Sequence, residues 1–163
     1  MIFQRSGEQY ADMSNELDAS HAFQIEAACM RLMAQYCHGL DTFDVAGILD
    51  LFVREGAWLR PGHLRPQDPT IEGREAIGLY LAGRERTLLM RHMVSNAVVS
   101  VIDAAHASGL SYWTVYKAEN PVAGTAAPLT GPFAIGEYRD QYRLEDSHWR
   151  IVSRTTSYAF RAV

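Results

Sequence analysis

The sequence has no long apolar run and no apolar start. It contains no stretch of about 20 consecutive apolar residues, the length that a membrane-spanning helix requires. The first residues, Met1 to Glu8, also lack the apolar core of a signal peptide. We therefore expect a cytoplasmic protein that makes no contact with membranes.

Basic clusters and nucleotide-binding motifs are missing as well. The chain has 15 Lys and Arg residues against 19 Asp and Glu residues, a net charge of −4, and these basic residues form no patch that would displace phosphate counterions. The Gly-x-Gly-x-x-Gly, Walker and Gly-x-Ser-x-Gly patterns are absent. These absences argue against nucleic-acid binding, dinucleotide cofactors, phosphoryl transfer and a serine nucleophile elbow.

Cysteine is scarce, and the histidines show no metal-ligand spacing. Cys29 and Cys37 lie eight residues apart in a predicted helix, a rise of roughly 12 Å that is too long for a disulfide. We interpret both as reduced thiols of the core or the pocket wall. Four histidines lie at predicted ends or in loops, so we expect no metal and no cofactor. They are His21, His63, His106 and His148.

What remains is the composition of one soluble globular domain. With 163 residues, 48% hydrophobic and 21% charged, the chain is long enough for one core and too short for two ordinary domains. Residues 1 to 20 are polar and weakly patterned. We interpret them as an N-terminal arm that docks on a partner subunit, and residues 21 to 163 as the domain.

Apolar residues recur at helical spacing in three segments. The first helix is predicted to begin near Ser20, a suitable N-cap, and to end near Gly39. A second follows from Val45 and includes Phe52. A third starts near Gly73 and fades near Leu88. The stripe of the first helix consists of Ile25, Ala28, Cys29, Leu32, Tyr36 and Leu40.

From Met90 onward the apolar period changes to two. This period predicts strands at 90 to 102, 106 to 117, 133 to 145 and 148 to 161, and a shorter strand is expected at 56 to 60. Helices followed by antiparallel strands predict an α+β domain. We expect a cone-shaped, curved antiparallel sheet with about three helices packed across its concave face, enclosing an apolar cavity.

The first of these long strands carries a titratable side chain near its start. Both faces of residues 91 to 102 are largely apolar, which is typical of a central strand. His92 and Asn96 should share one face, because side chains repeat every two residues. Residues 120 to 132 are rich in Pro, Gly, Ala and Thr and are predicted to form a mobile loop that acts as a lid.

Four residues form a candidate catalytic group. Tyr36 lies on the apolar stripe of the first helix, and Asp41 follows where that helix is expected to have ended. A carboxylate that binds one imidazole nitrogen fixes the tautomer and makes the other nitrogen a better base, so Asp41 would activate His92. Arg154 would reach inward from the last strand to pair with Asp41 or with an anionic or carbonyl substrate.

Structural interpretations stand beside these functional ones. Asp41 could only cap the second helix, and His92 could be a hydrogen-bonded histidine of the core. Tyr36 on an apolar stripe is more often a core residue, and Arg154 could face an interface or the surface. His38 is an alternative base. The side chains expected to line the substrate pocket are Trp58, Asn96, Tyr112 and Tyr138.

Several motifs together resemble a known family. They are Tyr36 with Asp41, Phe52-x-x-x-Gly-Ala-Trp58, Glu72-Gly73-Arg74-Glu75-Ala76-Ile77, Arg91-His92-x-x-x-Asn96 and Trp149-Arg150-Ile151-x-x-Arg154. The chain resembles the SnoaL-like family over about residues 21 to 160. That family belongs to the superfamily of nuclear transport factor two, scytalone dehydratase and ketosteroid isomerase, so the resemblance implies the cone fold.

The resemblance also implies roles for the candidate residues. In the bile-acid 7-alpha-dehydratase and hexachlorocyclohexane dehydrochlorinase groups, a histidine removes a proton and an aspartate orients it. These match His92 and Asp41, and the nearby arginine matches Arg154. The active-site tyrosine of the dehydratase matches Tyr36, where the dehydrochlorinase has a lysine. In scytalone dehydratase only the histidine carries over cleanly.

We therefore expect a cofactor-independent enzyme, most simply a lyase of the dehydratase type and otherwise an isomerase, whose ligand is a hydrophobic cyclic, aromatic, polyketide or steroid-like small molecule. Two alternatives stay open: a non-catalytic partner similar to the small subunit of aromatic-ring-hydroxylating dioxygenases, and a small-molecule carrier. We expect a homo-oligomer, either a dimer or a trimer, because both faces of several strands are apolar.

Overall fold

The computed structural model describes residues 17–59, 70–129 and 131–162. The predicted arm therefore lies outside the described residues as far as residue 16. Helix α1 (Ala19–Thr42) confirms the first predicted helix, but its N-cap is Asp18, whose side chain accepts from the His21 N–H at 2.7 Å, and not Ser20. The helix also runs further than predicted, so Asp41 lies in its last turn rather than after it.

Two short helices and two strands follow α1. Helix α2 (Val45–Asp50) is shorter than predicted, because Phe52 begins strand β1 (Phe52–Leu59). Strand β2 (Ile71–Glu72) precedes helix α3 (Arg74–Ala82), which starts where the sequence predicts. The expectation that α3 continues to Leu88 is wrong: the helix ends at a Gly83 cap, and strand β3 starts at Leu88.

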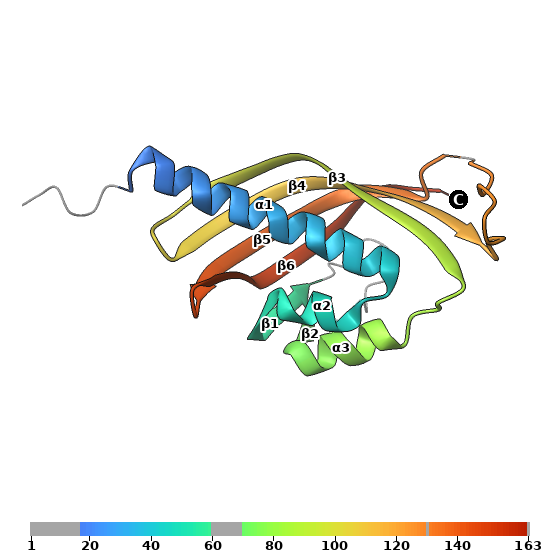
Figure 1. Cartoon of the computed structure of the whole chain (residues 1–163), viewed down its shortest axis with the longest axis horizontal. Helices are drawn as coiled ribbons and strands as arrows, with labels where there is room; N and C mark the ends of the chain where they lie inside the picture. Colours follow the sequence, from blue (N-terminus) through green and yellow to red (C-terminus); the bar gives the residue numbers. More distant parts are fainter. Residues whose placement is uncertain (1–16, 60–69, 130, 163) are drawn as a thin grey trace, which may run out of the picture.

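The four long strands lie where the sequence predicts them. They are β3 (Leu88–Val101), β4 (His106–Glu119), β5 (Ala134–Glu145) and β6 (His148–Arg161). The six strands form one sheet in the order β2-β1-β6-β5-β4-β3. The sheet is antiparallel except where β1 runs parallel to β6. Figure 1 shows how the four long strands curve beneath α1.

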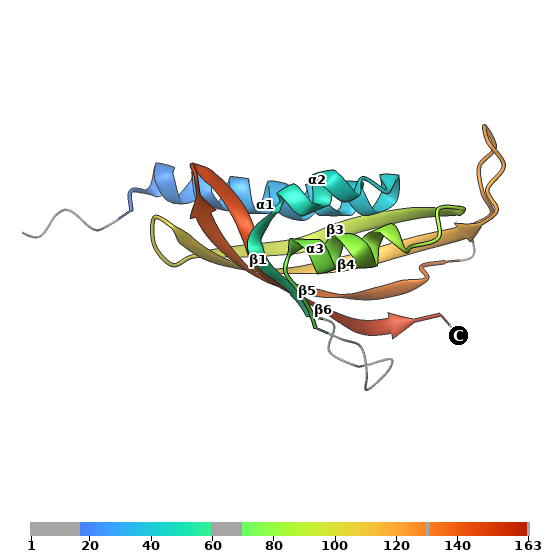
Figure 2. The same ribbon diagram turned by 90° about the horizontal axis from the view of Figure 1, so that it is seen from below.

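The central position predicted for β3 is wrong, because β3 is an edge strand. Both faces of β3 carry apolar residues, but only one of these faces packs against the core. Val94 and Val99 face the core and pack beneath α1, whereas Val98 on the opposite face is 61% exposed. Helices α1 and α2 lie on one side of the sheet (Figure 2), and no helix of the described residues covers the other side, which we call the open face. An apolar period on both faces does not show whether a strand is central in the sheet or is an edge strand with one uncovered apolar face.

An irregularity in β3 changes which side chains face the core. The register with β4 shifts between Ser95 and Val98, and Asn96 adopts a left-handed conformation with φ 51°. Such a bulge moves the following residues to the other face. His92 and Val94 face inward before it, and Asn96 is exposed. The prediction that Asn96 shares a face with His92 is therefore wrong.

At Gly136, strand β5 lies very close to β6 and to the Trp113 side chain, which forms part of the aromatic cavity wall. A Cβ atom added at Gly136 would overlap the Ser157 carbonyl oxygen and the ring of Trp113. Because Gly136 has no side chain, the Trp113 indole of the neighbouring strand can lie against β5. Its ring stacks on Tyr138, with centroids 5.8 Å apart. The sequence places a small residue at this point because no larger one fits.

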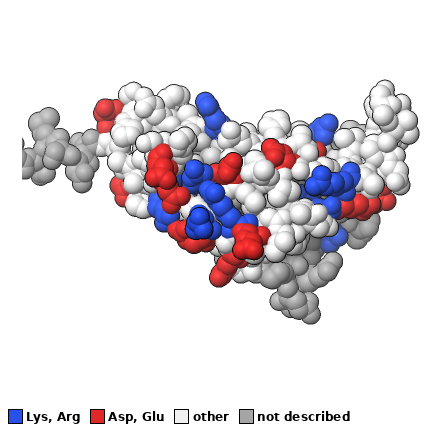
Figure 3. Space-filling model, turned by 60° about the horizontal axis from the view of Figure 1, so that its bottom comes forward, with Lys and Arg blue, Asp and Glu red and all other residues white. Residues whose placement is uncertain are grey.

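Charge on the surface is mixed. Figure 3 shows Lys and Arg side chains interleaved with Asp and Glu on one face of the molecule. Arg143, for example, pairs with Glu55 at 2.7 Å and with Glu145 at 2.9 Å. This pattern differs from the continuous basic patch that nucleic-acid binding requires. Among the described residues, no helix is long and apolar enough to cross a membrane.

Candidate active site

Asp41 and His92 are brought together by the packing of α1 on β3. The Asp41 Oδ1 atom lies 2.6 Å from His92 Nδ1, and the backbone N–H of His92 donates to the same carboxylate at 3.0 and 3.1 Å. The two side chains are only 8–9% exposed. The alternative that Asp41 only caps the second helix is wrong, because Asp44 caps α2 by accepting from the Gly47 N–H at 2.9 Å.

The geometry assigns the tautomer of His92. An ionised carboxylate only accepts hydrogen bonds, so Nδ1 must carry the proton that is donated to Asp41. The lone pair of the neutral ring is then on Nε2, and the same side chain lines a cavity. A neutral imidazole in this state can accept a proton at Nε2, and a carboxylate at Nδ1 stabilises the imidazolium that would result.

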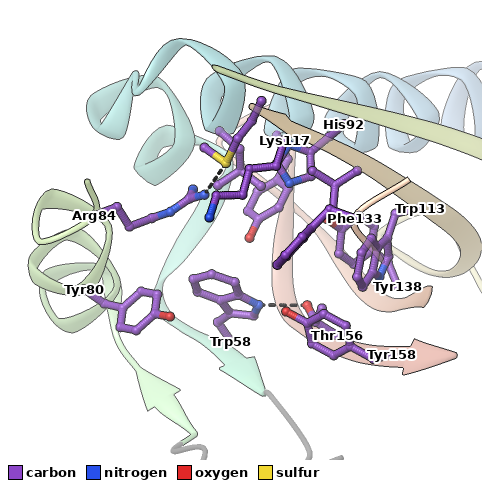
Figure 4. Close-up of a pocket in the computed structure, with 14 residues that line it drawn as sticks. Trp58, Tyr80, Arg84, His92, Trp113, Lys117, Phe133, Tyr138, Thr156 and Tyr158 are labelled. Carbon is purple, nitrogen blue, oxygen red and sulfur yellow. Dashed lines mark hydrogen bonds between the residues drawn. The ribbon is translucent and has the colours of Figure 1, made fainter. Parts of the chain in front are cut away.

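The cavity has a volume of about 150 Å³ and lies between α3, β1 and the concave face of the sheet. Its walls are mostly aromatic, as Figure 4 shows. The Trp58 indole N–H donates to Thr156 Oγ1 at 2.9 Å, which fixes one wall. The lining residues are Tyr36, Leu40, Trp58, Tyr80, Arg84, Met90, His92, Trp113, Val115, Lys117, Phe133, Tyr138, Thr156 and Tyr158.

Two of the four predicted pocket residues line this cavity. Trp58 and Tyr138 are buried in its wall. Asn96 lies at the bulge of β3 and is exposed. Tyr112 is 42% exposed on the open face of the sheet, opposite Ser95. The expectation that Asn96 and Tyr112 line the pocket is wrong, because each side chain faces away from the helices.

Tyr36 lines the cavity and carries a buried hydroxyl group. Its hydroxyl is fully buried and has no hydrogen-bond partner among the described residues. Burial raises the pKa of this phenol, and the nearby Arg154 only partly opposes the effect. The hydroxyl therefore stays protonated at any ordinary pH. An unsatisfied buried hydroxyl is costly unless a water or a ligand completes it.

Arg154 does not pair with Asp41, which corrects the prediction. Its Nε and Nη2 atoms donate to the two Asp140 carboxylate oxygens at 2.8 and 2.6 Å, and both side chains are fully buried. The guanidinium lies 4.1 Å from the ring centroid of Tyr36 and 4.3 Å from that of Tyr138. Arg154 is absent from the cavity lining, so it holds the two tyrosines from behind.

The sequence interpretation missed Asp140, although a signal was present. Asp140 alternates with Tyr138 and Tyr142 on the inward face of β5, so a charged residue occupies a core position. A buried carboxylate needs a cationic partner, and the register places Arg154 directly opposite. The Tyr142 hydroxyl also donates to Asp140, at 2.6 Å. Lys117 and Arg84, which line the cavity, were missed as well.

The remaining candidates have structural positions. His38, the alternative base, is exposed on α1, away from the cavity. Cys29 and Cys37 are free and buried, as expected. Burial raises the pKa of Cys37 to about 11 and that of Cys29 to about 12, so neither is a thiolate nucleophile near neutral pH. Within the described ranges, no three His, Cys, Asp or Glu side chains could hold a metal ion.

The His92–Asp41 contact makes a prediction about the proton on the ring. In the wild type we expect the Nδ1–H tautomer in long-range ¹H–¹⁵N spectra, with the resonance assigned by its loss in His92→Gln. Asp41→Ala removes both carboxylate oxygens, so Nδ1 loses its acceptor and the proton should shift toward Nε2. His106, whose Nδ1 lies 3.0 Å from Asp103, is an internal control. The same tautomer in both proteins would contradict the dyad.

The Arg154–Asp140 pair makes a prediction about stability. Asp140→Asn leaves a buried guanidinium without its counter-charge, which should lower the free energy of unfolding by about 3–5 kcal/mol. Tyr142→Phe removes only one hydrogen bond to Asp140 and should cost about 1 kcal/mol. Urea denaturation measures both. An Asp140→Asn variant as stable as the wild type would contradict this interpretation of the pair.

Comparisons with known proteins agree with this architecture. No curated protein matches the sequence. A variant of Rv3472, a protein of unknown function from Mycobacterium tuberculosis, has a similar structure with 26% identity and a TM-score of 0.70, covering 90% of this chain and 78% of that one. An NTF2-like protein with a cystatin-like fold from Novosphingobium aromaticivorans shares 23% identity, with a TM-score of 0.68 and coverage of 89% and 90%.

A hexachlorocyclohexane dehydrochlorinase, LinA type 2, has the same fold at 14% identity, with a TM-score of 0.71 and coverage of 88% of this chain and 90% of that one. At these identities below 25% the likeness concerns the fold alone. The model of the SnoaL-like domain family matches residues 22–155, which is most of the chain. Together with the curved sheet and the helices packed on it, this match shows that the chain belongs to the SnoaL-like domain family.

Proposed function

We propose that this protein is a cofactor-independent lyase of the dehydratase type that acts on a small cyclic molecule. The observation that carries the proposal is the 2.6 Å contact between Asp41 and His92 at the wall of an aromatic cavity. A carboxylate–imidazole pair of this geometry supplies a general base without any metal or cofactor. The structural likeness to a dehydrochlorinase, which is an elimination enzyme by name, supports the same class.

The elimination would proceed with three residues in distinct roles. His92 Nε2 takes a proton from a carbon next to a carbonyl group, and Asp41 stabilises the imidazolium that forms. The Tyr36 hydroxyl donates a hydrogen bond to the carbonyl oxygen, where negative charge develops. The electron pair of the broken C–H bond forms a C=C bond, the C–O bond of a β-hydroxyl group breaks, and the imidazolium returns the proton to release water. Arg154 keeps Tyr36 in place and does not touch the substrate.

The cavity volume restricts the substrate. A volume of about 150 Å³ is comparable to engineered protein cavities that accept a single benzene ring. One or two fused rings fit this space better than the four rings of a steroid. The walls that would contact them are aromatic, since Trp58, Trp113 and Phe133 all line the cavity. We therefore favour an aromatic or polyketide-like substrate over a steroid within the range that the sequence suggested.

Proton abstraction can be tested before the substrate is known. We expect the protein to accelerate exchange of the α-hydrogens of 1-tetralone, a bicyclic ketone, in D₂O, measured by proton NMR. His92→Gln should lower the enzymatic exchange rate about 10²–10⁴-fold, and Tyr36→Phe roughly 10²-fold. Tyr112→Phe, on the open face of the sheet, is the matched control and should leave the rate unchanged. An unchanged rate in His92→Gln would refute the proposed base.

Non-catalytic functions are the competing proposals. Neither a carrier nor an assembly subunit needs a contact between Asp41 and His92, so neither accounts for the site. Both predict no turnover, and the carrier also predicts that the cavity binds a ligand tightly. Copurification with a larger iron–sulfur protein would favour the assembly subunit.

Apolar residues exposed on the open face of the sheet support the proposal that the protein forms a homo-oligomer, either a dimer or a trimer. Exposed apolar side chains on this face are Met93, Val98, Ile102, Tyr112 and Phe160. Glu137 and Arg139 carry opposite charges on the same face of β5. Such a mixed surface can meet a second copy of itself, because a symmetric interface places each charge near its opposite.

Sedimentation velocity tests this association. We expect the wild type to sediment as a dimer or trimer and Val98→Glu to shift toward the monomer, because the substitution places a charge in the apolar patch. Leu79→Glu, an exposed apolar position on α3 rather than on the sheet, should leave the state unchanged. A wild type that is monomeric at all accessible concentrations would refute the proposal.

A further inference from the structure

We infer that the ligand of this cavity carries a carboxylate, which Arg84 and Lys117 bind, so that the substrate is a small aromatic acid rather than a neutral ring. This inference deepens the proposed function and rests on the same cavity. It starts from the charges in the lining. Arg84 and Lys117 both line the cavity, and the described lining residues include no Asp or Glu. An apolar cavity with two cations and no carboxylate favours an anionic ligand.

The two cations lie at the same end of the cavity. Lys117 on β4 is the register partner of Met90 on β3. The Arg84 Nη2 atom lies 3.2 Å from the sulfur of Met90, so both cationic side chains flank this one residue. In Figure 4, Arg84 extends from the α3 side and Lys117 from the strand opposite, on the same side of the aromatic walls. A single carboxylate can therefore be reached from two directions.

Neither cation has a strong partner that would exclude a ligand. Thioether sulfur is a weak acceptor, and among the described residues no carboxylate lies within 4.0 Å of the Arg84 guanidinium. Lys117 Nζ does pair with Glu119, at 2.9 Å, but that carboxylate is 70% exposed. An exposed ion pair of this kind contributes only about 0–1 kcal/mol, so a ligand carboxylate can replace Glu119.

The position of the cations relative to the base gives the inference its chemical content. Met90 and His92 are two residues apart on β3 and face the same way, which separates them by roughly 6.6 Å along the strand. If the carboxylate is held beside Met90, the ring of the ligand can lie against Trp113 and Phe133. The far edge of that ring is then within reach of His92. The guanidinium of Arg84 can bind a carboxylate with two parallel hydrogen bonds, which orients the ring as well as retaining it.

The test compares 2-naphthoate with its neutral amide, 2-naphthamide, by isothermal titration calorimetry. The wild type should bind 2-naphthoate at least about ten-fold more tightly than the amide. Arg84→Gln and Lys117→Gln should each lower affinity for 2-naphthoate about ten-fold, with little change for 2-naphthamide. Arg139→Gln, an exposed arginine on the open sheet face, is the control and should change neither. Circular dichroism spectra check that each variant is folded.

Two results would overturn the inference: equal binding of both probes by the wild type, including no binding of either, or equal loss of both in the variants. Binding to His92→Gln separates this inference from the proposed reaction. If His92→Gln keeps the preference for 2-naphthoate and the wild type shows no exchange on 1-tetralone, the anion site stands and the lyase fails. If exchange depends on His92 but 2-naphthoate has no advantage, only the anion site fails.

Discussion

The fully buried ion pair between Arg154 and Asp140 is the interaction on which the site depends. The two residues are direct register partners on β6 and β5, so the sheet itself holds them together. A guanidinium this deep is tolerated only with a counter-charge, and its flat faces then contact the rings of Tyr36 and Tyr138. Because Tyr36 belongs to α1, the ion pair also fixes where that helix lies on the sheet. Asp41 lies five residues further along the same helix, so its meeting with His92 follows from this packing.

This arrangement separates support from chemistry. Asp140, Arg154 and Tyr142 form a layer beneath the cavity and do not line it. The Tyr36 side chain, which this layer supports, lines the cavity, and its hydroxyl is fully buried. Burial keeps that hydroxyl protonated, since it raises the phenol pKa more than Arg154 lowers it. A rigid donor that needs no reorganisation is what stabilisation of a developing oxyanion requires.

The sequence was most informative where a period or a motif spans several residues. The stripe of α1, the four long strands and the approach of Asp41 to His92 were predictable, because each follows from spacing or from the family pattern. The partner of Arg154 was not, since a one-dimensional pattern does not say which carboxylate lies across the sheet. Asn96 was misplaced because a bulge changes the phase of β3, and no residue before it signals that change. Arg84 was missed because it follows the end of α3, where no period applies.

The ladder between β3 and β4 offers a reason why one fold can serve many ligands. Successive inward pairs on it are Met90 with Lys117, His92 with Val115, and Val94 with Trp113. The first pair adjoins the proposed carboxylate site, the second carries the proposed base, and the third contributes an aromatic wall. Successive inward residues are two positions apart on each strand. A substitution at the first pair therefore changes the charge offered to a ligand without moving His92. In the proposed function, ligand choice and proton transfer therefore depend on neighbouring but independent positions of one rigid element, so the chemistry can persist while the substrate changes.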